Sequence, residues 1–229
     1  MSHAWARRLA PVALLAGVLT AAPALAHDET RLEEEFIKGA FSPSFVPPSP
    51  GTYELPVLGK VGSFVLLDAD GRRVSTATLM RGKAAVVSFV YTACSDRLGC
   101  PLASTVLRDV QQRLRAEDLA GQTILLTISF DVTRDTPARL ATYARALDAD
   151  PALWQFLTAA SAPSLDGLLR SYGQDRARLY DERGRFTGRY RHVLKVFLVD
   201  RAAQIRNVYS AGFLVPQVVI NDIKTVLAQ

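Results

Sequence analysis

Two cysteines separated by five residues are the strongest chemical feature of the sequence. Cys94 and Cys100 stand in the segment YTACSDRLGCP, residues 91–101, and the chain has no other cysteine. On a single helix this spacing would rotate the two thiols about 240° apart, so they can meet only if residues 95–99 form a loop. Two thiolates on such a loop are soft donors suited to Cu(I), and the pair could instead form a structural disulfide.

The residues around the cysteines indicate where the loop sits in the fold. The run AAVVSFV, Ala84–Val90, is apolar throughout and predicts a strand that is covered on both faces. The loop follows this strand, and a helix must begin at Cys100 or Pro101. We expect the dipole of that helix to lower the pKa of Cys100, which favours the thiolate needed for metal ligation and for disulfide exchange. A loop at the carboxyl end of a central strand favours a functional site over a structural disulfide.

His192 by itself is weak evidence for a site. A lone histidine in a strand-rich segment is more often a satisfied or surface residue. The chain has no Ser or Cys triad motif around it, which argues against a histidine general base. An imidazole added to two thiolates would let one site hold Cu(II) as well as Cu(I).

Two charged residues are weaker candidates. Asp131 lies just after a predicted strand and could act behind the metal ligands or at a partner surface, whereas Asp135 or Thr136 is expected to cap the next helix. Arg97 stands between the two thiols, where it could stabilise a thiolate or contact an acidic partner. For Arg97, an ordinary solvated arginine is the simpler interpretation.

The elements that must position these residues follow from hydrophobic periodicity. Buried strands joined through helices imply right-handed parallel crossovers, so the order predicts an α/β, thioredoxin-like layered sheet. The expected elements are a hairpin at 63–71, strands at 84–90 and 123–130, helices from 101 to about 119 and from 137 to about 147, a short strand at 156, a helix at 164–172 ended by Gly173, strands at 193–199 and 205–209, and a terminal helix from 215.

The N-terminal residues are expected to be a targeting segment and a linker. Residues 1–26 have a positive start, an apolar stretch and the small-residue site Ala24-Leu25-Ala26, which predict a secretory signal; an uncleaved anchor is the alternative. An acidic segment covers 27–40, and the proline-rich stretch 41–56 predicts a semi-rigid linker. The domain at 57–229 is then periplasmic or otherwise extracytoplasmic, where disulfides form and copper is handled.

Composition excludes several function classes. The net charge of +5, from 27 Lys and Arg against 22 Asp and Glu, is spread along the chain, so nucleic acid is not an expected partner. With 2 Met, 2 Cys and 3 His, Met-rich or His-rich metal carriage is excluded and a metal site must be small.

Four segments together resemble the SCO/SenC family, the copper-binding assembly factors for cytochrome c oxidase. They are the DADG turn at 68–71, the cysteine segment at 91–101, ISFDVTRDTP at 128–137, and Tyr190-Arg191-His192 before a strand. The resemblance covers nearly all of residues 57–229. It implies a thioredoxin-like fold with an additional N-terminal β-hairpin.

The resemblance also implies the ligand set. Family members bind one copper per monomer through two cysteines and a late histidine, which correspond here to Cys94, Cys100 and His192. Two positions depart from the family pattern: five residues separate the cysteines where three are usual, and Val193 follows the histidine where a small hydroxyl residue is common. These departures leave copper ligation plausible on chemical grounds and bear mainly on the identity of the copper acceptor.

Two functions therefore compete. The first is an extracytoplasmic metallochaperone that delivers copper to a cuproprotein, such as the oxidase subunit with the binuclear copper site. The second is a thiol-disulfide oxidoreductase that reduces a partner's cysteines. The five-residue spacer and the lack of proline at 190–192 disfavour an ordinary thioredoxin-type reductase. The expected partners are a copper acceptor and an upstream copper donor or thiol reductant, with the chain itself a monomer.

Overall fold

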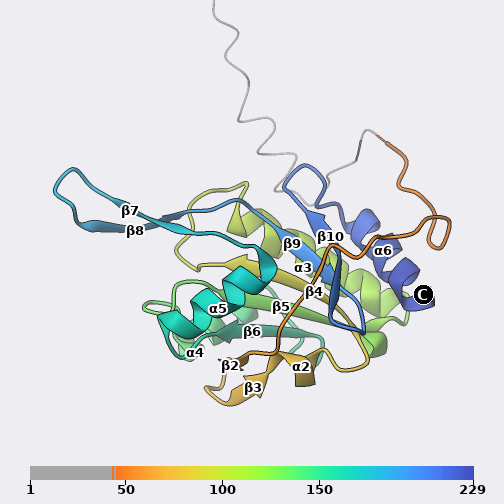
Figure 1. Ribbon diagram of the computed structural model, residues 1–229, viewed down its shortest axis with the longest axis horizontal. Coiled ribbons are helices and arrows are strands. Elements are labelled where there is room, and N and C mark those ends of the chain that lie inside the picture. The colour runs from red at the N-terminus through yellow and green to blue at the C-terminus, as the bar shows by residue number, and fades with distance from the viewer. Residues whose placement is uncertain (1–42, 44) are drawn as a thin grey trace, which may run out of the picture.

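A central mixed sheet dominates the computed structural model, which describes residues 43 and 45–229 (Figure 1). The main sheet has the order β1-β10-β9-β4-β5-β6-β2-β3, and β7 and β8 form a separate hairpin. The strands are β1 (Gly59–Lys60), β2 (Val65–Leu67), β3 (Arg73–Ser75), β4 (Ala84–Val90), β5 (Thr123–Ser129), β6 (Trp154–Thr158), β7 (Ala177–Tyr180), β8 (Phe186–Arg191), β9 (Val196–Val199) and β10 (Gln204–Tyr209). The helices are α2 (Thr76–Leu79), α3 (Cys100–Ala116), the 3-10 turn η1 (Ala120–Gln122), α4 (Pro137–Ala146), α5 (Ala162–Tyr172) and α6 (Pro216–Ala228).

The middle of the sheet is parallel and fully covered. β4 pairs in parallel with β5, β5 with β6, and β9 runs antiparallel to β4 on the other side. Every residue of β4 and β5 is buried, as their continuous apolar runs predict. The carboxyl ends of β4 and β5 therefore lie at one edge, from which the cysteine loop and the Asp131 loop leave.

Alternate residues of the central strands pack into two separate hydrophobic cores, one on each face of the sheet. One core takes Val87 and Phe89 of β4 and packs them against α5 residues such as Leu165 and Tyr172. The other takes Val86 with residues of α3, α4 and α6. The sheet is thus covered by helices on both faces, which is the thioredoxin-like layering expected from the sequence.

Local signals fix the helix ends near the site. Helix α3 begins at Cys100 with Pro101 in its first turn, and Thr136 caps α4 by accepting a hydrogen bond from the Arg139 amide. Gly173 ends α5 in the left-handed conformation at φ 59°. The sequence left the start of α3 at Cys100 or Pro101 and the cap of α4 to Asp135 or Thr136, and the structure selects Cys100 and Thr136; the end of α5 at Gly173 is confirmed.

The expected N-terminal hairpin is confirmed, whereas the expected strand at 193–199 is only partly present. The N-terminal hairpin is present as β2 and β3, with Asp68 accepting hydrogen bonds from the amides of Asp70 and Arg72 across the turn. The expected strand at 193–199 begins only at Val196, and the β7–β8 hairpin before it was not predicted. Most side chains of that hairpin are exposed, so it lacks the apolar alternation from which a strand is recognised.

The described part of the proline-rich stretch lies against α6. The Asn221 side chain donates to the Pro48 carbonyl at 2.8 Å, the Gly51 amide donates to Thr225 Oγ1 at 3.0 Å, and the Tyr53 hydroxyl donates to Asp222. The signal segment 1–26 and the acidic segment 27–40 fall outside the described residues. Among the described residues, 43 and 45–229, no helix is both long enough and apolar enough to cross a membrane.

Candidate metal centre

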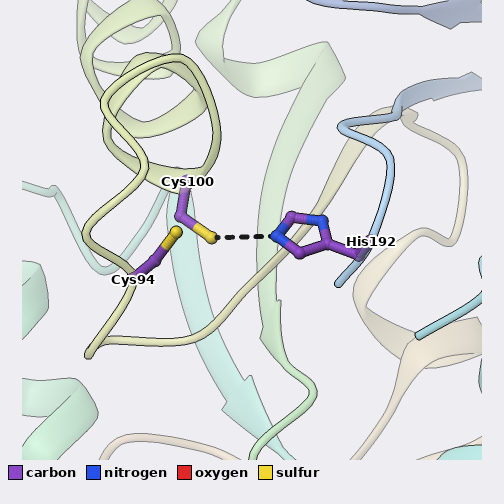
Figure 2. A group of neighbouring side chains, drawn as sticks. All are labelled: Cys94, Cys100 and His192. Carbon is purple, nitrogen blue, oxygen red and sulfur yellow. Dashed lines mark hydrogen bonds between the residues drawn. The ribbon is translucent and has the colours of Figure 1, made fainter. Parts of the chain in front are cut away.

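Three side chains from distant parts of the sequence meet at the carboxyl edge of the sheet. Cys94 comes from the loop after β4, Cys100 is the first residue of α3, and His192 follows β8 (Figure 2). Their ligand atoms all lie within 4.8 Å of one another, and Cys100 Sγ is 3.8 Å from His192 Nε2. The structure therefore brings together the three residues that the sequence analysis selected.

Asp96 shapes the loop that returns Cys94 toward α3. Its side chain accepts a hydrogen bond from the Leu98 amide at 3.1 Å, and its carbonyl accepts one from the Gly99 amide at 3.0 Å. A Cβ at Gly99 would lie 3.3 Å from that carbonyl oxygen, so the close turn favours glycine. The five intervening residues thus form a compact turn that ends where the helix begins.

The two sulfurs differ in burial and in acidity. The pKa of Cys94 is lowered to about 4, chiefly by a hydrogen bond from Cys100 and further by one from His192, against the opposing effect of burial. The pKa of Cys100 is raised, because its proton is held by Cys94 and because the residue is only 1% exposed. The expectation that the helix terminus makes Cys100 the acidic thiol was wrong. Burial next to a better solvated thiolate outweighs the helix dipole.

Aromatic rings form the wall behind His192. The imidazole centroid lies 4.9 Å from that of Phe130 and 6.1 Å from that of Tyr91, both in edge-on arrangements. Burial and the neighbouring Cys94 raise the pKa of Tyr91 to about 12, so its phenol stays protonated. A cavity of about 230 Å³ opens in front of this wall, and its lining includes Cys94 and His192. The site is therefore dry on one side and accessible on the other.

Asp131 reaches the site only through Tyr190. The Asp131 carboxylate is 1% exposed, accepts a hydrogen bond from the Tyr190 hydroxyl at 3.2 Å, and pairs with Arg134. The Arg134 guanidinium also donates to the carbonyl of Gly188 in β8. Tyr190 in turn packs edge-on against Phe130, with ring centroids 5.4 Å apart. These contacts tie the strand that precedes His192 to the body of the protein.

Asp135 has a role that the sequence analysis did not assign to it. It is buried, and its carboxylate accepts hydrogen bonds from the amide and the hydroxyl of Thr92 and from the Ser129 hydroxyl. Capping of α4 falls to Thr136 alone. Asp135 therefore holds the start of the cysteine loop, and a hydroxyl residue two positions before Cys94 is the only sequence signal for that link.

Arg97 is the last of the residues selected from the sequence. It is exposed on the turn between the two cysteines. Of the five candidate residues, the structure brings three together, buries Asp131 behind them and leaves Arg97 on the surface.

The fold and the site together define a thioredoxin-like protein with two thiols and an imidazole converging at the carboxyl end of its central strands. The SCO1/SenC family model matches residues 57–228, and the chain belongs to this family. Among curated proteins no significant match was found.

Solved structures show the same fold. A SCO1/SenC family lipoprotein from Bacillus anthracis aligns with a TM-score of 0.64 at 21% identity, over 75% of this chain and 97% of its own. ScoI from Bradyrhizobium japonicum, described with copper bound, aligns with a TM-score of 0.60 at 24% identity, over 73% and 99%. BsSco, described as having a disulfide switch and as a member of the Sco family of cytochrome c oxidase assembly proteins, aligns with a TM-score of 0.62 at 23% identity, over 77% and 98%.

Proposed function

We propose that this protein is an extracytoplasmic copper metallochaperone that delivers copper to a cuproprotein, the binuclear copper site of cytochrome c oxidase being the expected acceptor. The observation that carries the proposal is the convergence of Cys94, Cys100 and His192 within 4.8 Å. Membership of the SCO1/SenC family and the likeness to a copper-bound ScoI support it. The likeness to a lipoprotein of the family supports action outside the cytoplasm.

The donor set suits copper as cargo. Two thiolates satisfy Cu(I) in a nearly linear arrangement, and the imidazole supplies the nitrogen that Cu(II) prefers. Cys94 already bears the charge of a thiolate at neutral pH, because its pKa is about 4, and copper would replace the proton that Cys100 retains. One such set per chain gives one copper per monomer.

Copper titration of the reduced protein against a competing Cu(I) chelator tests the proposal. We expect one copper per chain, lost when the cysteines are oxidised to a disulfide, since both thiolates then disappear. His192→Ala should weaken Cu(II) binding and remove intensity from the thiolate-to-Cu(II) charge-transfer band while leaving most Cu(I) binding. Equal copper affinity in the oxidised and reduced forms would exclude the site.

A thiol-disulfide oxidoreductase is the second candidate, and the unequal pair of thiols favours it. The Cys94 thiolate would attack a partner disulfide, forming a mixed disulfide and releasing one partner thiol. Cys100 would then attack Cys94, so that the chain ends as a disulfide and the partner as a dithiol. Reduction of an oxidised copper acceptor by the copper-free protein tests this reaction. Under this function alone, His192→Ala would be nearly silent.

A further inference from the structure

The β7–β8 hairpin projects from the body of the protein (Figure 1), and its sequence carries a concentration of arginines. Its exposed guanidinium groups outnumber its carboxylates, and one of those carboxylates, Asp181, is already paired with Arg185. The exposed arginines of the hairpin and its end are Arg178, Arg183, Arg185, Arg189 and Arg191.

Two of these arginines line the metal cavity itself. Arg189 and Arg191 alternate along β8 and, together with Leu179 of β7, belong to the same cavity lining as Cys94 and His192. Within residues 43 and 45–229, neither guanidinium has a carboxylate at ion-pair distance. Among the described residues that line the cavity, Asp96 is the acidic one.

Exposed apolar side chains accompany this charge. Val193, next to His192, is 65% exposed, and Tyr180 near the tip of the hairpin is 59% exposed. Arginine and tyrosine are the residues most often found at the energetic centres of protein interfaces, because each combines a large apolar surface with a polar end. The exposed side chains of the hairpin are therefore of the kinds that suit contact with another protein.

We infer that the hairpin and the cavity rim form a docking surface for an acidic face of the copper-accepting protein. Arg189 and Arg191 pair with carboxylates that surround the acceptor's own copper ligands. This inference rests on the proposed function and adds to it the charge and the position of the partner. Nucleic acid and membrane lipid fit less well, because Arg189 and Arg191 line the same cavity as Cys94, where a partner that reaches Cys94 would meet them.

Charge reversal on the rim is the test. The variants are Arg189→Glu, three residues from His192, and Arg189→Glu with Arg191→Glu. The matched control is Arg73→Glu with Arg81→Glu, which makes the same change of net charge at exposed positions in β3 and after α2. The probe is the copper-free soluble domain that carries the binuclear copper centre of cytochrome c oxidase, and its association with the full, copper-loaded chain is measured at low and high salt.

The expected result separates the docking surface from the metal site. At low salt the rim variants should associate about tenfold or more slowly than the wild type, with the difference shrinking at high salt, while the control stays close to the wild type. Copper affinity is measured on the same preparations, so that an effect of the substitutions on the metal site is told apart from an effect on association.

Two outcomes overturn the inference. One is association of the rim variants at the wild-type rate, with its salt dependence unchanged. The other is arginine-dependent binding to vesicles containing phosphatidylserine without binding to the domain, which would assign the surface to anionic lipid. Failure of the proposed function looks different, because the wild-type chain would then bind no copper in the titration.

Discussion

Substitution of Gly188 tests how firmly β8 is held to the body of the protein, through the loss in the free energy of unfolding. Its φ is +79°, and a Cβ placed there would clash with Arg134 Nη1. That guanidinium donates to the Gly188 carbonyl and pairs with buried Asp131, so it has little freedom to withdraw. Gly188→Ala must therefore displace Arg134 as well as place alanine in the left-handed region.

The expected cost has two parts. The left-handed conformation costs alanine about 1–2 kcal/mol, and disturbing a hydrogen bond to a charged group costs about 1.5–3 kcal/mol. Gly184→Ala is the matched control, because Gly184 has φ +72° in the same hairpin but nothing within 4 Å of its added Cβ. Gly188→Ala should thus lose about 1.5–3 kcal/mol more of the free energy of unfolding than Gly184→Ala.

Urea unfolding of the reduced, metal-free protein measures both losses. A double-mutant cycle isolates the steric part: in an Arg134→Ala background, Gly188→Ala should cost no more than Gly184→Ala, since nothing remains to be displaced. Equal costs of the two glycine substitutions in the wild-type background would refute the reasoning and show that Arg134 yields freely.

Three other contacts each give a prediction. Because the pKa of Cys94 is about 4, iodoacetamide should alkylate Cys94 in the reduced, metal-free protein at a rate that is nearly constant from about pH 5.5 to 8 and falls as the thiolate is protonated near pH 4; a rate that rises steadily up to pH 8.5 would contradict this. Asp135→Asn should cost about 1–3 kcal/mol in urea unfolding, because an amide cannot accept all the hydrogen bonds from Thr92 and Ser129, whereas the exposed control Asp166→Asn should cost less than about 1 kcal/mol. Tyr53→Phe should speed limited proteolysis within 45–56, because the tyrosine hydroxyl no longer holds the stretch to α6, and an unchanged cleavage rate would show that this hydrogen bond is dispensable.

The sequence predicts those parts of the fold that depend on local pattern. The apolar runs of β4 and β5 need cover on both faces wherever they occur, and Pro101, Pro137 and Gly173 mark helix ends through their own backbone preferences. The β7–β8 hairpin could not be predicted in this way. Its position depends on Arg134 and Tyr190 contacts between segments more than fifty residues apart.

The candidate site likewise has some features that the sequence reveals and others that only the fold creates. The two cysteines can be selected from their spacing and from the strand before them, whereas His192 is selected only through the resemblance to a family, because nothing in its neighbours indicates a ligand. The acidity of the thiols was assigned to the wrong residue. A helix terminus is visible in the sequence, but the burial of Cys100 and the hydrogen bond that it gives to Cys94 exist only in the folded protein.

The unequal exposure of the two sulfurs sets an order for any exchange at this site. Cys94 lines the open cavity, whereas Cys100 is 1% exposed at the start of α3 and is absent from that lining. A ligand from another protein could therefore replace Cys94 on a bound metal while the bond between the metal and Cys100 remains. In the copper delivery that we propose, transfer would proceed one bond at a time, with the metal held by both proteins midway, and it would not pass through a free ion in solution.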